Sequence, residues 1–262
     1  MSLAGPTVET MSLAPTTAHG PARAAGALLA WAEHHFAGLA PLQAATRRAL
    51  AEEPTTAGMA RLVAPVATRL LAHTDLAVVG AGFVAAPAAL DDTAYWLEWW
   101  TADEPGDAPQ RLVVETDPAG DTFRDWTTLP WFAVPATTGR RHITGPYVDY
   151  LCTDEYTLTF TMPVHRDEAL AGVVGCDVYV RHVEQLAEGW LDLVEGPAAF
   201  VSREGRVLVS SAPGVVTGDL LRSLPLARLW EGATVPGLHL TACGDLPFGL
   251  VVGEALAAGR RP

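Results

Sequence analysis

The chain has 262 residues, of which 49% are hydrophobic, so it can fold around a sizeable core. Thirty acidic residues against seventeen basic ones give a net charge of −13, which argues against nucleic acid and anionic membrane surfaces as partners. The cysteines Cys152, Cys176 and Cys243 form no CxxC pair and no metal-ligand spacing. Neither a disulfide framework nor a zinc site is therefore expected.

The first seventy residues read as a leader followed by helices. Residues 1–20 are small and polar and contain the tetrapeptide MSLA twice, so we expect a disordered leader. Residues 21–73 form an Ala-rich helical region in which Pro41 predicts a kink or break and Pro65 a soft interruption. No apolar run reaches the ~18 residues of a membrane span, and no signal peptide is recognisable. A soluble, cytoplasmic protein is expected.

From residue 74 the apolar period switches from helical to alternating, which predicts a larger unit of strands over residues 74–182. The expected strands are 76–86 (with a glycine interruption), 95–101, 111–117, 156–164 and 170–180. The second and third of these are expected to pair as a hairpin because Glu-Pro-Gly-Asp lies between them. In the fourth, Thr157, Thr159 and Thr161 share one face of the strand.

Residues 183–262 predict a connecting helix and a smaller unit that repeats the outline of the first. The helix covers residues 181–194, and a hairpin that turns at Glu204-Gly205 follows it. A short helix near residues 219–224 and two closing strands complete the unit. The chain is therefore of the α+β class.

Asp177 is the most informative residue because it is an acid inside the otherwise apolar strand LAGVVGCDVYV. A carboxylate among valines is costly unless a cation or hydrogen-bond donor meets it. A ligand pocket would supply such a partner. The plainer alternative is a strand-end acid that caps a loop or pairs with an arginine.

Three motifs surround this acid in the sequence: Trp131-Phe132, the turn Pro146-Tyr147-Val148-Asp149, and GVVGCD ending at Asp177. With the order of elements over residues 22–253, they resemble the double Cache (PAS-like) sensor domains. That family supplies ligand-binding modules to bacterial chemoreceptors and histidine kinases. The resemblance implies a long N-terminal helix followed by two PAS-like antiparallel-sheet subdomains, with the ligand in the larger one.

The resemblance also implies a ligand site, and this sequence retains the half of it that binds an ammonium group. In amino-acid-binding members an arginine two residues before the tryptophan holds the ligand carboxylate, and here Leu129 occupies that position. The strand aspartate that holds the ligand ammonium remains as Asp177. Aromatic faces add to such a cation site. The site residues inferred on this basis are Trp126, Trp131, Phe132, Tyr147, Asp149 and Asp177, although Asp149 fits a turn cap better than a ligand contact.

We therefore expect a small-molecule sensor with no cofactor and no catalytic activity, whose ligand is a cationic amine. A homodimer and a separate signalling or regulatory protein are the further partners considered. Trp96, Glu98 and Trp100 alternate on one strand face and read as sheet or dimer surface.

Two alternatives stay open. Gly80 and Gly82 fit a dinucleotide fingerprint, with Glu98 near the place of a ribose-binding acid, so a nucleotide-dependent enzyme is conceivable. Pro87 falls where the required helix should run, which disfavours this reading. The chain could instead be a degenerate dimerisation scaffold in which Asp177 pairs with Arg140 or Arg141.

Overall fold

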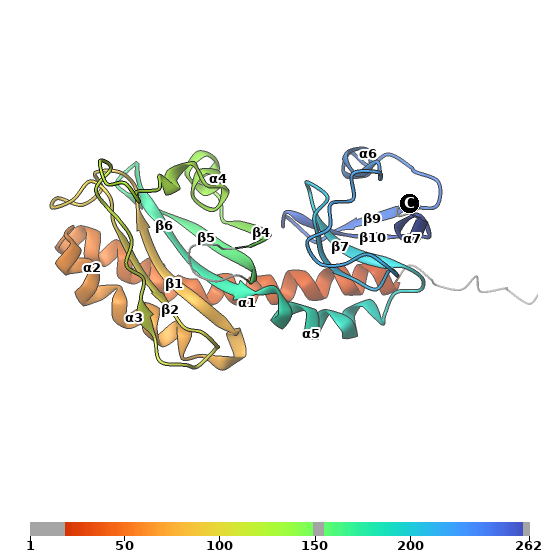
Figure 1. Cartoon of the computed structure of the whole chain (residues 1–262), viewed down its shortest axis with the longest axis horizontal. Coiled ribbons are helices and arrows are strands. Elements are labelled where there is room, and N and C mark those ends of the chain that lie inside the picture. Colours follow the sequence, from red (N-terminus) through yellow and green to blue (C-terminus); the bar gives the residue numbers. More distant parts are fainter. Residues whose placement is uncertain (1–18, 149–154, 259–262) are drawn as a thin grey trace, which may run out of the picture.

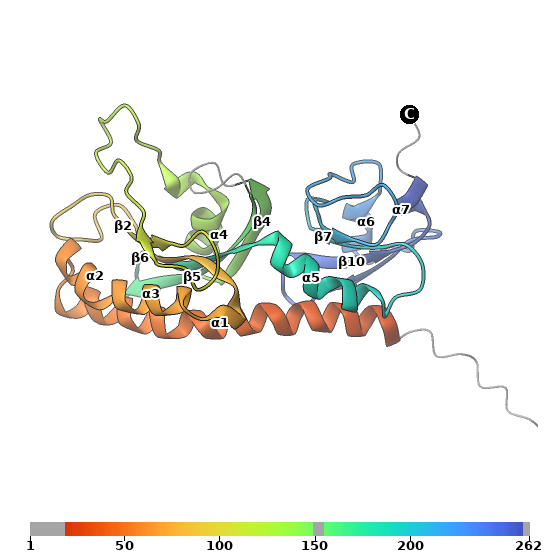
Figure 2. The ribbon, with the colours of Figure 1, turned by 60° about the horizontal axis from the view of Figure 1, so that its bottom comes forward.

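The computed structural model describes residues 19–148 and 155–258. The expected leader lies almost wholly outside these residues. Helix α1 (His19–Glu52) runs as one long rod beneath both sheets of the protein (Figures 1 and 2). Pro41 lies inside this helix, so the predicted break is wrong. Because the neighbouring Leu39 and Leu42 are fully buried, their packing offsets the cost of a missing helical hydrogen bond.

Two short helices follow α1 and pack on the same side of the larger sheet. Helix α2 (Thr56–Leu62) begins at Thr55, whose side chain accepts a hydrogen bond from the Gly58 amide. Helix α3 (Ala64–Leu71) has Pro65 in its first turn, where no amide hydrogen is needed. Pro65 therefore starts a new helix. A 3₁₀ turn, η1 (Thr74–Leu76), leads into the sheet.

The larger sheet has six antiparallel strands in the order β3-β2-β1-β6-β5-β4. Their bounds are β1 Val78–Ala85, β2 Leu97–Thr101, β3 Gln110–Arg111, β4 His142–Val148, β5 Tyr156–Arg166 and β6 Ala169–Tyr179. The hairpin of β2 with β3 is confirmed, but the predicted strand 111–117 is wrong beyond Arg111. Val113 is 82% exposed and its neighbours Leu112 and Val114 are only partly buried, so burial holds this segment to the sheet weakly.

One face of this sheet packs on the helices. Phe160 of β5 is fully buried there, and its ring lies 5.4 Å from Trp31 and 5.3 Å from Phe36 of α1. Glu98 is also fully buried on this face and accepts hydrogen bonds from the indole nitrogens of Trp96 (3.4 Å) and Trp100 (3.0 Å). The interpretation of these three residues as a sheet or dimer surface is therefore wrong for Glu98. A carboxylate buried here is stabilised by the two indole donors.

The opposite face of the sheet carries the 3₁₀ turn η2 (Trp126–Thr128) and helix α4 (Pro130–Thr138), which lies across the sheet from α1 (Figure 1). Thr157, Thr159 and Thr161 point to this side and are each at least 97% buried, as the alternation of β5 predicts. The sheet is therefore covered on both faces.

Helix α5 (Val180–Leu191) follows β6 directly, lies against α1 and leads to the smaller unit (Figure 2). The smaller sheet has the order β8-β7-β10-β9. Its elements are β7 Ala198–Ser202, β8 Val207–Ser210, α6 Leu226–Trp230, β9 His239–Ala242, β10 Phe248–Val252 and α7 Ala255–Ala258. The helix expected near 219–224 is wrong. Leu220 forms a β-bridge with Arg206, and the helix begins only after Pro225.

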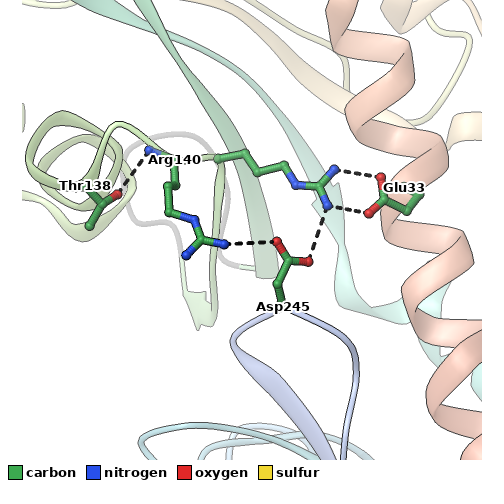
Figure 3. Close-up of polar contacts among 5 residues, drawn as sticks. Glu33, Thr138, Arg140 and Asp245 are labelled. Carbon is green, nitrogen blue, oxygen red and sulfur yellow. Dashed lines mark hydrogen bonds and ion pairs between the residues drawn. The ribbon is translucent and has the colours of Figure 1, made fainter.

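An ion-pair cluster joins the two units and α1 where helix α4 ends. Arg141 donates to both carboxylate oxygens of Glu33 on α1, at 2.7 Å for the Nη1–Oε2 pair, and lies 3.4 Å from Asp245 in the β9–β10 turn. Arg140 approaches the same Asp245 at 3.6 Å (Figure 3). The guanidinium of Arg141 also lies over the Phe36 ring. The turn after α4 is thereby tied to both α1 and the smaller unit.

The hydrogen bonds from Arg141 lower the pKa of Glu33 below its ordinary value of 4.5. A lowered folded-state pKa stabilises the fold above the unfolded-state pKa, and this contribution disappears as the pH falls through the folded-state value. We expect Glu33→Gln to be less stable than the native protein at pH 7, with a difference that shrinks below pH 4.5. Urea unfolding between pH 3 and 7 measures it. Glu168→Gln, at an exposed turn, is the control, and a difference independent of pH would contradict the assignment.

Candidate functional site: a cavity over the central strands

Strand register places a row of small and polar residues across the centre of the larger sheet. Gly80 of β1 pairs with Thr101 on one side and with Asp177 of β6 on the other. Asp177 in turn pairs with Thr159 of β5, and Thr159 pairs with Thr144 of β4. Residues that pair in register share one face of a sheet. Asp177 is therefore at the middle of this row.

A cavity of about 290 Å³ lies over this face of the sheet. It is lined by Val84, Leu97, Trp99, Leu112, Leu129, Pro130, Trp131, Thr144, Tyr147, Thr159 and Asp177. The floor comes from the strands, and the segment at the start of α4 supplies Leu129, Pro130 and Trp131. Among the lining residues that the structure describes, Asp177 is the one with a charged side chain. The described lining is thus mostly apolar, with one carboxylate.

The carboxylate of Asp177 is only 7% exposed and is held by a directed hydrogen-bond chain. The Thr159 hydroxyl donates to Oδ1 at 2.6 Å, and the Tyr147 hydroxyl lies 2.7 Å from the Thr159 oxygen. Because Thr159 has only one proton and gives it to the carboxylate, Tyr147 must donate to Thr159. A hydrogen bond to a charged acceptor is stronger than one between neutral groups.

The second carboxylate oxygen of Asp177, Oδ2, has room in the sheet because residue 80 is a glycine. A Cβ on Gly80 would lie 2.6 Å from Oδ2 and 3.1 Å from Trp99 Nε1. No side chain larger than hydrogen therefore fits beside Asp177 without displacing it. Gly80 and Gly82 lie within strand β1, whose pairing with β6 shifts register between Val78 and Gly80, so the Gly80–Gly82 turn of the nucleotide alternative is wrong. Both glycines pair with β2 and β6, so their backbone is not arranged as a phosphate-binding loop.

The residues inferred from the sequence divide into three groups. Asp177, Trp131 and Tyr147 line the cavity, as does Leu129, the position of the missing arginine. Trp126 and Phe132 do not line it, because they are buried behind its wall at 4% and 3% exposure. Asp149 lies outside the described residues.

Trp126 and Phe132 are therefore corrected from ligand contacts to supports. Trp126 packs edge-on against Tyr95 at 5.5 Å, and the Phe132 ring packs edge-on against Trp131 at 6.3 Å. Both belong to one apolar cluster with Trp99, against which Trp131 packs. They therefore support the residues that line the cavity.

Other lining residues were not predicted from the sequence, Trp99 and Thr159 above all. The alternation of β5 was a usable signal for Thr159, since it groups this residue with Thr157 and Thr161 on one face. Trp99 gave no such signal, because only the register of β2 against β1 places it on the cavity side. Arg140 and Arg141 contact Asp245 and Glu33, so the predicted pairing of Asp177 with either arginine is wrong.

Two features are absent from the described ranges, 19–148 and 155–258. Within them no group of three or more His, Cys, Asp or Glu residues could hold a metal ion. Within the same ranges no helix is both long and apolar enough to span a membrane.

Comparison with known proteins agrees with this geometry. Residues 110–185 match the family model of the first PDC sensor domain of methyl-accepting chemotaxis protein-like proteins. This segment contains Trp131, Tyr147 and Asp177, and it covers less than a third of the chain. No match was found among curated proteins.

Solved structures extend the likeness to both units. Methyl-accepting chemotaxis protein X has a TM-score of 0.62 at 15% identity, with 89% of this chain and 94% of that chain covered. The ligand-binding domain of the Pseudomonas aeruginosa PAO1 amino acid chemoreceptor PctC, in complex with GABA, has a TM-score of 0.52 at 23% identity (87% and 94% covered). That of Pseudomonas fluorescens chemoreceptor CtaA, with L-leucine, has 0.54 at 18% (90% and 92% covered). The chain therefore has the double Cache fold that the resemblance implied.

Replacing Gly80 with alanine tests whether this glycine makes room for the carboxylate. The new methyl group would force Asp177 and Trp99 apart, so we expect Gly80→Ala to lower the free energy of unfolding by about 1–3 kcal/mol. Denaturant unfolding measures it. Gly26→Ala is the matched control, because a Cβ there meets nothing within 4 Å on the exposed side of α1. It should raise stability by up to about 1 kcal/mol, and equal effects at both glycines would refute the crowding argument.

Proposed function

We propose that this chain is the ligand-binding part of a sensor and that its cavity binds a small molecule through an ammonium group. The observation that carries the proposal is Asp177, a nearly buried carboxylate that borders a cavity whose other described lining residues are uncharged. A ligand ammonium in this cavity would add charge and hydrogen bonds to those that the carboxylate already has.

The surroundings of Asp177 support a cation over other ligands. Trp99, Trp131 and Tyr147 border the same cavity, and aromatic faces attract ammonium groups. At about 290 Å³ the cavity is at the lower end of the range of small-molecule sites, about 300–1,000 Å³. A metabolite with few heavy atoms would fill it.

The lining of the cavity favours a ligand that lacks a carboxylate. Leu112, Leu129 and Pro130 are part of the apolar lining, and none of the lining residues that the structure describes is Arg, Lys or His. GABA and L-leucine, bound by the relatives described above, each carry both an amino and a carboxyl group. The amino end would find a partner in Asp177 here, whereas a carboxylate would have to be buried unpaired. A cationic amine is thus the better fit.

Binding, and not a chemical reaction, is the proposed role. The segment that opens α4 forms one wall of the cavity, and α4 ends at the cluster that contacts α1 and the smaller unit. A ligand that draws this wall inwards would favour one arrangement of the units over another. Signal output through a separate protein, a homodimer, and a cytoplasmic location remain predictions.

The experiment is a thermal-shift screen against amines and quaternary ammonium compounds, amino acids, and small carboxylates. A ligand at one hundred times its dissociation constant should stabilise the protein by about 2.7 kcal/mol. We expect hits among the amines, and a loss of affinity of at least about tenfold in Asp177→Asn, because a charged hydrogen bond is removed.

Asp103→Asn is the control, since it makes the same change of charge at an exposed position away from the cavity. It should bind as the native protein does. Hits confined to carboxylates would contradict the proposal and direct attention to the arginines beside Asp245. Silence in all three panels would favour the dimerisation scaffold.

A further inference from the structure

Trp99 is held rigidly against the floor of the cavity. Its side chain is on the cavity face of β2, and the residue is only 6% exposed. In register beside it are Gly82 of β1 and then Gly175 of β6. A Cβ on Gly175 would lie 3.3 Å from the far ring atom Cη2, so the indole reaches across β1 to β6. The glycine bed on which the ring lies is therefore formed by Gly80 and Gly175, whose missing Cβ atoms would lie 3.1 Å from Nε1 and 3.3 Å from Cη2.

This packing fixes the direction of the indole N–H. A single point above Gly80, the place of its missing Cβ, lies 3.1 Å from Trp99 Nε1 and 2.6 Å from Asp177 Oδ2. The indole N–H, a hydrogen-bond donor, and the Asp177 carboxylate, an acceptor, thus both border the space above Gly80. The ring cannot turn its N–H elsewhere without leaving the glycine bed.

The N–H of Trp99 finds no acceptor among residues 19–148 and 155–258. The two neighbouring tryptophans differ in this respect, because Trp96 and Trp100 both donate to Glu98 on the helix side of the sheet. Among the described residues the indole nitrogens of Trp126 and Trp230 are unpaired and fully buried, whereas that of Trp99 is not among the buried unpaired atoms and opens on the cavity. A ligand that covered this donor without offering an acceptor would bury it unpaired, which costs affinity.

We propose that Trp99 is a specificity-determining residue, whose N–H binds an acceptor atom that the ligand carries next to its ammonium group. This inference rests on the proposed binding of an amine at Asp177. It narrows the ligand class to amines with an ether or hydroxyl oxygen about two carbons from the nitrogen. A plain alkylamine would satisfy Asp177 and leave the indole N–H unpaired, which is how a polar site rejects an analogue that lacks one atom.

The test compares n-butylamine with 2-methoxyethylamine, in which an oxygen replaces one methylene of the same chain. Dissociation constants are measured by calorimetry for the native protein and for Trp99→Phe, which keeps a ring in the glycine bed and removes the N–H. We expect Trp99→Phe to reduce the preference for 2-methoxyethylamine over n-butylamine by about threefold to tenfold. Differences in hydration between the two amines cancel in this comparison.

Trp131→Phe is the matched control, because it makes the same change at the other tryptophan that lines the cavity. It should leave the ratio of the two dissociation constants unchanged. An unchanged ratio in Trp99→Phe, or a change only in Trp131→Phe, would overturn the role of Trp99 while leaving the amine site intact. If neither amine binds the native protein at millimolar concentration, the amine site itself is wrong and the inference falls with it.

Discussion

The rest of the larger unit is arranged around one electrostatic constraint, a carboxylate in the middle of the central strand of a sheet. Asp177 has strands on both sides and is almost inaccessible to solvent. The residues that pair with it on the two neighbouring strands accommodate this carboxylate. Thr159 donates a hydrogen bond from β5, and Gly80 leaves room on β1. The glycines that permit this also create the flat surface on which Trp99 lies.

Each face of the sheet carries a buried carboxylate, and the two carboxylates have different surroundings. On the helix side, the fully buried Glu98 is satisfied within the protein by two indole donors and lies 3.6 Å from Arg111. On the cavity side, Asp177 has an open volume beside it, with a free indole donor nearby. The first carboxylate is enclosed by donors of the protein, whereas the second borders a cavity. The same residue types, an acid and tryptophans, thus occur in a packed environment on one face and beside an open volume on the other.

Much of the fold could be predicted from the sequence because the responsible signals are local. Apolar periodicity identified the helices before the first strand, and the alternation of Thr157, Thr159 and Thr161 assigned the faces of β5. Failures came where tertiary packing overrides local preference: α1 continues through Pro41 because both flanking leucines are buried, and the segment after Arg111 leaves the sheet despite its valines. Turn and helix signals could not resolve the region near Leu220, which a β-bridge holds.

The site was predictable only in part, and for a related reason. Asp177 stood out because an acid in an apolar strand is costly, and the motif resemblance led to Trp131 and Tyr147. Neither argument could separate Trp131 from its neighbour Phe132, since which of them faces the cavity depends on how α4 docks. Trp99 required the register between β1 and β2. The register between two such strands cannot be read from the residues of one strand alone.

The most direct measurement is a crystal structure of the protein with the amine that binds it best. The ligand nitrogen should lie within hydrogen-bond distance of Asp177, with its remaining atoms against Leu112, Leu129 and Trp131. A ligand whose nitrogen points away from Asp177, or one bound outside the cavity near Asp245, would contradict the central claim that a buried carboxylate selects the ligand.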